Sequence, residues 1–528
     1  MRVANDKWPT KPWLLLLFAG ALACSRESGE ASRKKAAESS PEAVPREVPQ
    51  VEAVDAGAAN RVSSSAVADA GPKQEASPKA SPALSFAAWL KGKLPAGGKV
   101  DENPVRVVHK VASGDTHASI AQAYLDLTDV YLAEDLAALL QKRGPLSEGA
   151  EVEIPSLLRE PYKEPAEDRL GWPADSVLRG VFLTGLMAGR QYVPTLDKLA
   201  ERGLNAVVLD GKDYMGPVNY ASKAKIALET GATKNILIPN LPRTIRFAHA
   251  RGVRVIMRIP CFHDPWAQKR APRLSVMGNW GKPFPLSWLD PVNEEAQDYA
   301  IELAREMADA GADEIQLDYV RFPVQGPVKS AVLPPAKDGI RSRVIRDFVK
   351  KVADVVKPKG VKLSLDIFGV ASTGQQEDIE ALGQEIGIMS VDADAISPMV
   401  YPSHYDAGFY GFKDPANHPE IIGIGTKAAV EKLRKAGNKT TVVRSWLQAF
   451  SWRTSAYGPK YVADEIKHAE ATGTGWLLWD PGCTYGAAWA GIPKLSATAL
   501  AANAVKSPDM KSPDMKSSDM KSSDITKK

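Results

Sequence analysis

From residue 179 to residue 500, short runs of apolar residues alternate with longer segments whose apolar positions recur at helical spacing. The short runs have the length and composition of buried strands, and the longer segments have the period of amphipathic helices. Strands that alternate with helices indicate βαβ units and a parallel sheet. The pattern predicts strands at 180–185, 206–210, 253–260, 314–318, 362–368, 395–401, 441–446 and 475–480.

Eight strand and helix units in about 320 residues are typical of a (β/α)8 TIM barrel with enlarged loops, an α/β fold. We assign residues 175–505 to this barrel. An open, doubly wound sheet is the alternative, but the lone Gly423-x-Gly425 pair is too weak a motif to indicate a dinucleotide site there. The expected helices include 195–202, 243–251, 294–310, 340–356, 428–436 and 461–471.

A smaller pattern precedes the barrel at residues 104–157. A strand at 107–111, a Gly114-Asp115-Thr116 turn that caps a helix, a second helix at 132–141 and a strand ending at Pro155 predict a β-α-α-β unit. The order of the Gly-Asp-Thr, Ile120-Ala121 and Ile154-Pro155 elements resembles the LysM domain. That resemblance implies binding of glycans that contain N-acetylglucosamine, such as peptidoglycan or chitin.

The N-terminus has the features of an export signal. Basic residues precede an apolar run at 13–23 that is too short to span a bilayer, so residues 1–24 are predicted to be a signal peptide. Ala21-Leu-Ala-Cys24 resembles the bacterial lipoprotein cleavage site, which implies lipidation of Cys24 and attachment to a membrane. Ser25 in place of Asp favours, by the same resemblance, the outer membrane of the cell envelope.

Two further segments lack the apolar residues needed for a core. Residues 25–103 are rich in Ala, Ser, Pro, Glu and Lys, so we expect a disordered tether. Residues 506–528 repeat a five-residue unit that fits neither helix nor strand, and we expect a disordered tail.

Charge and cysteine content narrow the classes of partner. A net charge of +4 on 528 residues gives no indication of nucleic-acid binding. Cys261 and Cys483 could form a disulfide in an exported protein, but they end strands that are not neighbours in a barrel, so we expect free thiols. The sequence has seven His and no His-x-His or Glu-x-x-His at a strand end, so we predict no metal site and no cofactor. The alternative is a Mg²⁺ or Ca²⁺ ion bound by Asp side chains and carbonyl oxygens.

Carboxylates recur at the ends of the predicted strands, where barrel enzymes build their active sites. Side chains alternate along a strand, so Asp318 and Asp366 should both point into the barrel from adjacent strands, opposite Leu317 and Leu365. A pair of carboxyl groups is what glycoside hydrolysis requires. We predict Asp318 as nucleophile or base and Asp366 as general acid. For Asp318 alone, a turn cap or a pair with Arg321 is the structural alternative.

Other polar and aromatic residues share this rim. Aromatic rings can stack on the apolar faces of sugars, and charged groups can bind sugar hydroxyls. Trp266, Trp280, Trp288 and Trp452 add to the aromatic content of the rim loops. The predicted substrate-binding residues are Asp210, Lys212, Arg258, His263, Asp264, Tyr319, Arg321, Tyr401, His404, Trp446, Trp479 and Asp480.

Five motifs carry a resemblance to a known family. Phe182-Leu-Thr and the segments 205–213, 256–259, 313–323 and 396–405 resemble the bacterial putative glycosyl hydrolase domain family, a TIM-barrel group distantly related to α-amylase-type enzymes. The amylase-type relatives carry an Asp nucleophile at the end of strand four and an acid at the end of strand five, which match Asp318 and Asp366. Gln316 replaces an Arg of those relatives, and Asp366 replaces their Glu, so the stereochemistry stays open.

Together these features predict a surface-anchored glycoside hydrolase. It would act on an amino-sugar polysaccharide, peptidoglycan or an exopolysaccharide, by a two-carboxylate mechanism. The alternative is a non-catalytic cell-wall protein that binds glycans through LysM and a degenerate barrel.

Overall fold

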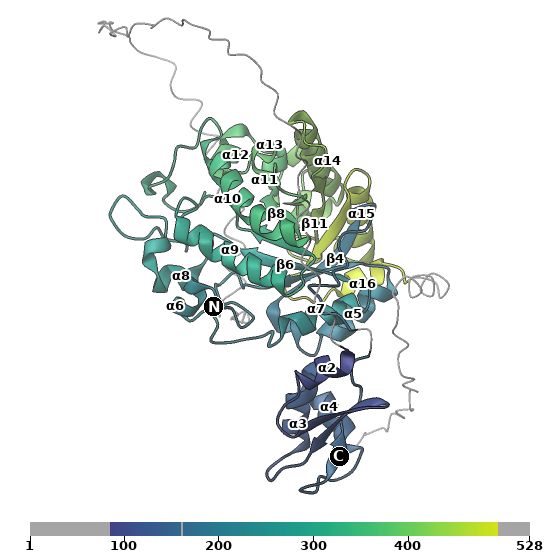
Figure 1. The fold of residues 1–528 in the computed structure, drawn as a ribbon. Coiled ribbons are helices and arrows are strands. Elements are labelled where there is room, and N and C mark those ends of the chain that lie inside the picture. Colours follow the sequence, from purple (N-terminus) through teal and green to yellow (C-terminus); the bar gives the residue numbers. More distant parts are fainter. Residues whose placement is uncertain (1–84, 160–161, 495–528) are drawn as a thin grey trace, which may run out of the picture.

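The computed structural model describes residues 85–159 and 162–494 (Figure 1). These residues form a small N-terminal unit and a large α/β barrel. The predicted signal peptide, Cys24, the tether up to residue 84 and the tail at 506–528 lie outside the described residues. No helix in the described ranges is long and apolar enough to cross a membrane.

Eight parallel strands, one of them interrupted, close the barrel, which confirms the (β/α)8 prediction. The pairs β12–β4 and β8–β9 complete the ring. The interrupted strand is split at Arg444 into β10 and β11, and both parts pair with β9. The strands are β4 (Leu178–Leu183), β5 (Ala206–Asp210), β6 (Arg254–Pro260), β7 (Glu314–Asp318), β8 (Lys362–Phe368), β9 (Ala395–Met399), β10 (Val442–Val443), β11 (Ser445–Gln448) and β12 (Gly475–Trp479).

Helices cover the outside of the ring, and side-chain caps fix where several of them begin. Asn240, Asp264 and Asn293 each accept a hydrogen bond from a backbone amide in the first turn of the helix that follows. The helices of the barrel are α5 (Tyr192–Glu201), α6 (Lys225–Thr230), α7 (Leu241–His249), α8 (Pro265–Arg270), α9 (Glu294–Asp309), α10 (Ile340–Val356), α11 (Gly369–Thr373), α12 (Gln376–Leu382), α13 (Ile386–Met389), α14 (Glu420–Lys435), α15 (Pro459–Glu470) and α16 (Gly486–Gly491).

Helix α14 begins at Glu420, well before the predicted start at residue 428. Gly423 and Gly425, which lower helix propensity, therefore lie inside a helix and not in a nucleotide-binding loop. A Cβ atom at Gly425 would lie 2.3 Å from Val400 Cγ1, so close packing of the helix on the end of β9 requires glycine there.

The amino end of the barrel is closed by the segment that precedes β4. Arg169 donates hydrogen bonds to the carbonyl groups of Ala312, at 3.1 Å, and Lys359, at 3.0 Å. Trp172 Nε1 donates to Glu314 Oε2 at 2.8 Å. Glu314 is fully buried and forms a two-pronged ion pair with Arg444 inside the barrel. This plug leaves the carboxyl ends of the strands as the open end.

The N-terminal unit contains the predicted β-α-α-β order as β2 (Val105–Lys110), α3 (His117–Tyr124), α4 (Ala133–Gln141) and β3 (Glu151–Glu153). Thr116 caps α3 as expected. Two further elements, α2 (Phe86–Lys91) and β1 (Gly98–Glu102), lie within the range 25–103 that we expected to be a tether. They fold because Phe86, Leu90 and Val100 enter the core of this unit. The short apolar run at 86–90 was missed because the range 25–103 as a whole is rich in Ala, Ser, Pro, Glu and Lys.

The N-terminal unit packs against the outside of the barrel beside α5 and α7 (Figure 1). Arg243 on α7 donates a hydrogen bond to the carbonyl oxygen of Val130 at 2.7 Å, and Arg246 donates to that of Thr128 at 2.8 Å. Tyr131 packs its ring against Phe247, with ring centroids 4.9 Å apart. The contact therefore joins backbone carbonyl groups of one unit to guanidinium groups of the other.

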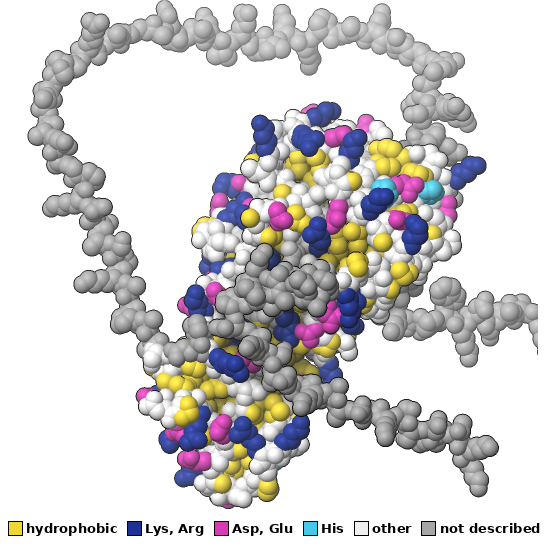
Figure 2. Space-filling view, turned by 90° about the vertical axis from the view of Figure 1, so that its right-hand side faces the viewer, with side chains coloured by type: hydrophobic (Ala, Val, Ile, Leu, Met, Phe, Trp, Pro, Cys, Tyr) yellow, Lys and Arg dark blue, Asp and Glu magenta, His cyan; other side chains and the backbone are white. Residues whose placement is uncertain are grey.

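Surface charge is mixed. On the face shown in Figure 2, Lys and Arg side chains are interspersed with Asp and Glu side chains over the body of the molecule.

Cys261 and Cys483 are buried and free, which confirms the expectation of unpaired thiols.

Candidate active site

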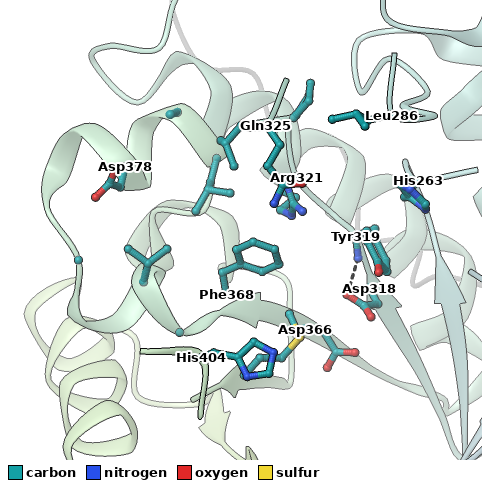
Figure 3. A pocket seen from close by; sticks show the side chains of 18 of the residues that line it. His263, Leu286, Asp318, Tyr319, Arg321, Gln325, Asp366, Phe368, Asp378 and His404 are labelled. Atoms are coloured by element: carbon teal, nitrogen blue, oxygen red, sulfur yellow. Dashed lines mark hydrogen bonds between the residues drawn. The ribbon is translucent and has the colours of Figure 1, made fainter. Parts of the chain in front are cut away.

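A cavity of about 1060 Å³ opens at the carboxyl ends of the barrel strands (Figure 3). This is the end of the barrel at which the sequence predicts the active site. Of the predicted site residues, the cavity is lined by Arg258, His263, Asp318, Tyr319, Arg321, Asp366, Tyr401, His404, Trp446 and Trp479. The structure therefore brings both predicted catalytic carboxyl groups into one hollow.

Arg258, near the end of β6, lies close to three carboxyl groups that belong to three other strands. Its Nη1 atom lies 2.5 Å from Asp210 Oδ1 on β5. Its Nη2 and Nε atoms donate to Asp318 Oδ2 on β7 at 2.6 and 3.1 Å. Asp366 Oδ2 on β8 lies 3.9 Å from Nε. One buried guanidinium thus balances a cluster of acids that would otherwise repel each other.

Asp318 accepts hydrogen bonds from two kinds of donor. Arg258 binds one oxygen, and the backbone amide of Tyr319 donates to the other at 2.6 Å. Tyr319 has a φ of 50°, in the left-handed region that a bulky residue rarely adopts. Such conformations cluster at functional sites, and here it accompanies a short bond from the amide to the carboxylate of the preceding residue.

The structural alternative considered for Asp318 was an ion pair with Arg321. Asp318 instead pairs with Arg258. Arg321 has its guanidinium group between two rings, 4.4 Å from the Trp288 centroid and 4.0 Å from that of Phe368. Its Nη1 atom donates to the carbonyl oxygen of Phe322 at 3.1 Å. These contacts hold the guanidinium group in the cavity wall.

Asp366 lies in a different environment. It is 1% exposed, and its Oδ1 atom accepts a hydrogen bond from Trp446 Nε1 at 2.7 Å. Burial and the neighbouring Asp318 raise the pKa of Asp366 well above its ordinary value, and Arg258 and Trp446 offset only part of this rise. The direction of this shift favours the protonated form, which is the form a general acid needs.

The spacing of the two carboxyl groups is limited by the arginine between them. Nε of Arg258 lies 3.1 Å from Asp318 Oδ2 and 3.9 Å from Asp366 Oδ2. Those two oxygens can be no more than about 7 Å apart, a limit that includes the roughly 5–5.5 Å of retaining glycosidases and only the lower edge of the inverting range.

Four predicted substrate-binding residues do not line the cavity. Asp210 lies behind Arg258, where burial raises its pKa to about 7 and Arg258 opposes this rise. Lys212 pairs with Asp264 at 3.0 Å, and both are buried. Asp264 also caps α8, and the Asp480 carboxylate accepts hydrogen bonds from the amides of Gly482, Thr484 and Tyr485. Position at a strand end suggested substrate contact for these residues, but their charges serve the internal structure of the loops.

The cavity also contains residues that sequence reasoning missed, among them Tyr214, Phe368, Tyr405 and Phe409. Phe368 follows Asp366 by two positions on β8, so strand alternation could have placed it on the same face. Tyr405 and Phe409 lie in an irregular loop whose path has no periodic signal. Of the rim tryptophans, Trp288 lines the cavity and Trp280, 45% exposed, does not.

Within the described ranges, His, Cys, Asp and Glu side chains form no group of three that could hold a metal ion. The acids that come together at Arg258 are occupied by its guanidinium group and by hydrogen bonds from Tyr319 and Trp446.

Over residues 180–485, the chain matches the family described as "Putative glycosyl hydrolase domain". Among solved structures it is similar to a hypothetical protein from Ruminiclostridium thermocellum ATCC 27405, with 32% identity, 35% of this chain and 96% of that chain covered, and a TM-score of 0.31. It is also similar to the PgaB (BpsB) glycoside hydrolase domain from Bordetella bronchiseptica, with 13% identity, 61% and 100% covered, and a TM-score of 0.45. A GH20 exo β-N-acetylglucosaminidase from Vibrio harveyi has 13% identity, 62% and 56% covered, and a TM-score of 0.38. No curated protein matches the chain.

Proposed function

Because the chain belongs to the putative glycosyl hydrolase domain family, we propose that it hydrolyses glycosidic bonds with Asp366 as general acid and Asp318 as nucleophile or base. The observation that carries this proposal is a pair of carboxyl groups on adjacent strands, each in a different environment. Arg258 and the Tyr319 amide donate hydrogen bonds to Asp318, and burial raises the pKa of Asp366. Acid and base roles in glycosidases are set by such differences.

In the proposed reaction, Asp366 gives its proton to the leaving glycosidic oxygen as the bond to the anomeric carbon breaks. Asp318 either attacks that carbon, forming a glycosyl ester that water then hydrolyses with the Asp366 carboxylate as base, or removes a proton from a water that attacks the carbon directly. The limit of about 7 Å between the two Oδ2 atoms is compatible with direct attack and retention and reaches the lower part of the roughly 6.5–9.5 Å range of inverting enzymes. Proton NMR of the first-formed anomer tests this point.

The substrate in this proposal is an amino-sugar polysaccharide, either peptidoglycan or an exopolysaccharide. Support comes from the N-terminal unit, whose β2-α3-α4-β3 order and Thr116 cap agree with a LysM-like domain. The same proposal includes export by the predicted signal peptide and lipidation at Cys24, with the enzyme on the outer membrane or elsewhere in the cell envelope. Labelling with a radioactive fatty acid and a Cys24→Ala control tests the anchor.

The catalytic test compares Asp318→Asn and Asp366→Asn in the secreted chain without its lipid anchor. Each variant should lose about 10²–10⁴-fold in kcat while circular dichroism shows that it stays folded. Asp318→Asn should also lower the melting temperature, because it removes a charge partner of buried Arg258. Asp338→Asn is the matched control, because Asp338 is exposed, lies outside the cavity lining and has a φ of 55° that Asn tolerates. Purified sacculi, chitin and amylose serve as substrates. Full hydrolysis by both active-site variants would end the assignment.

A non-catalytic glycan-binding protein is the second candidate. One observation favours it: both oxygens of Asp318 are already engaged, one by Arg258 and one by Tyr319. A nucleophile must give up part of this bonding to attack. Binding of a glycan with no release of reducing ends, measured on the same panel, would select this candidate.

A further inference from the structure

Aromatic side chains line the cavity on two sides of the carboxyl pair. Figure 3 shows His263 and Tyr319 on one side of Asp318 and Asp366, and His404 on the other. We define the first platform as His263, Trp288 and Tyr319. The second platform is Tyr401, His404 and Trp479, and all six residues line the cavity.

The rings of the first platform support each other. His263 stacks on Tyr319, with centroids 5.0 Å apart and an interplanar angle of 29°. Trp288 lies 5.6 Å from His263 and 6.2 Å from Tyr319. All three follow β6 or β7 in the sequence. The platform therefore belongs to one arc of the rim.

The second platform lies on another arc, after β9 and at the end of β12. Tyr401 packs 5.4 Å from Trp479 and 5.1 Å from His404. Burial lowers the pKa of both His404 and His263 to about 4, so both imidazoles are neutral near pH 7. The histidine rings of both platforms are therefore uncharged and suited to the apolar faces of sugar rings, and the Arg321 guanidinium lies 4.4 Å from the Trp288 centroid beside the first platform.

Strand order separates the platforms. Asp318 on β7 and Asp366 on β8 lie between β6 and β9 in the ring. Neighbouring strands are about 4.8 Å apart, so the three steps from β6 to β9 span roughly 14 Å of barrel wall. The cavity of about 1060 Å³ is also above the roughly 300–1,000 Å³ that encloses a drug-sized ligand.

We propose that this cavity takes a linear polysaccharide lying across both platforms, with the carboxyl pair beneath an internal bond, so that the enzyme cuts within chains. This inference rests on the proposed hydrolase function and specifies its substrate class and mode of cleavage. A pocket for a single terminal sugar would need one platform and a closed end. Here sugar units on both sides of the cleaved bond have rings to stack on.

Two measurements test the inference. Wild-type protein is given a soluble glycol chitin and solubilised peptidoglycan strands, and viscosity is followed together with reducing ends. Internal cleavage lowers viscosity before many reducing ends appear. Separately, the Asp366→Asn variant is titrated with N-acetylglucosamine oligomers of increasing length, with intrinsic tryptophan fluorescence as the signal. Affinity should rise with length until both platforms are covered.

Platform variants add a readout that simple loss of stability would not give. In the Asp366→Asn background, His263→Ala and Trp479→Ala should each weaken binding of long oligomers by about two- to tenfold. Binding of the shortest oligomer should be lost in at most one of them. Trp280→Ala is the control, because Trp280 is exposed and outside the cavity lining.

The outcomes separate the inference from the hydrolase assignment. Length-dependent binding without hydrolysis supports the extended cleft and removes only the catalytic assignment. Hydrolysis that releases single sugars from chain ends, or affinity that does not change with length, overturns the inference and leaves the hydrolase in place. Absence of both binding and hydrolysis on these polymers overturns both.

Discussion

Replacing Arg258 by methionine removes the cation that lies among Asp210, Asp318 and Asp366. The arginine is 2.5 Å from Asp210 and 2.6 Å from Asp318, and all three partners are buried. Removing one side of a buried ion pair costs about 3–5 kcal/mol, because the other charge is left unpaired. A domain is stable by only about 5–15 kcal/mol. We therefore expect Arg258→Met to fold but to lose a large part of its free energy of unfolding near pH 8.

The size of this loss should depend on pH. Burial raises the pKa of Asp210 to about 7 and also raises that of Asp366, and Arg258 opposes both rises. A carboxyl group whose pKa is higher in the folded state contributes stability below its unfolded pKa, about 3.9, and loses it as pH rises. Without the arginine both pKa values rise further. The deficit should be smallest near pH 4 and largest near pH 8.

Urea unfolding of the secreted chain at about pH 4, 6 and 8 measures the deficit. Arg258→Lys is the matched variant, because lysine keeps one positive charge but not the planar fork that reaches Asp210 and Asp318 together. It should recover part of the free energy of unfolding near pH 8 and little of the activity. A deficit that is absent, or equal at all three pH values, would refute the idea that Arg258 serves to balance buried carboxylates.

Three further predictions concern other buried groups. Trp446→Phe removes a donor that lowers the pKa of Asp366, so the alkaline limb of the kcat profile should move to higher pH, and an unmoved limb would argue against Asp366 as the acid. Glu314→Gln leaves the fully buried Arg444 without its counter-charge and should cost about 3–5 kcal/mol in urea unfolding, with kcat unchanged because the pair is at the far end of the barrel. Burial raises the pKa of Glu465, so Glu465→Gln should stabilise the protein by about 1–3 kcal/mol near pH 8 and little near pH 4. Equal melting temperatures of this variant and wild type at both pH values would contradict that expectation.

The sequence predicted the barrel because each strand is a local run of apolar residues. It also placed Asp318 and Asp366 inside the barrel, because the alternation of side chains along a strand is local too. The partners of these acids come from distant segments. Arg258 was predicted to contact substrate, but its register against Asp210 depends on strand pairing that no local pattern specifies. The positive φ of Tyr319 likewise has no signal in a residue type that seldom adopts it. The folded segment at Phe86–Lys91 was missed because its apolar run is short, follows a long polar stretch and is buried only by tertiary contacts.

A single arginine explains why two chemically identical side chains can take different roles. Arg258 makes two hydrogen bonds to Asp318 at 2.6 and 3.1 Å but lies 3.9 Å from Asp366. A hydrogen bond requires a shorter approach than 3.9 Å, so only Asp318 gains both the charge and the bond. Asp366 has the desolvation of a buried acid with one neutral donor, Trp446. The asymmetry therefore comes from the offset of the guanidinium group toward β7, and a lysine at this position, with one compact charge, could not make both bonds to Asp318 while also reaching Asp210.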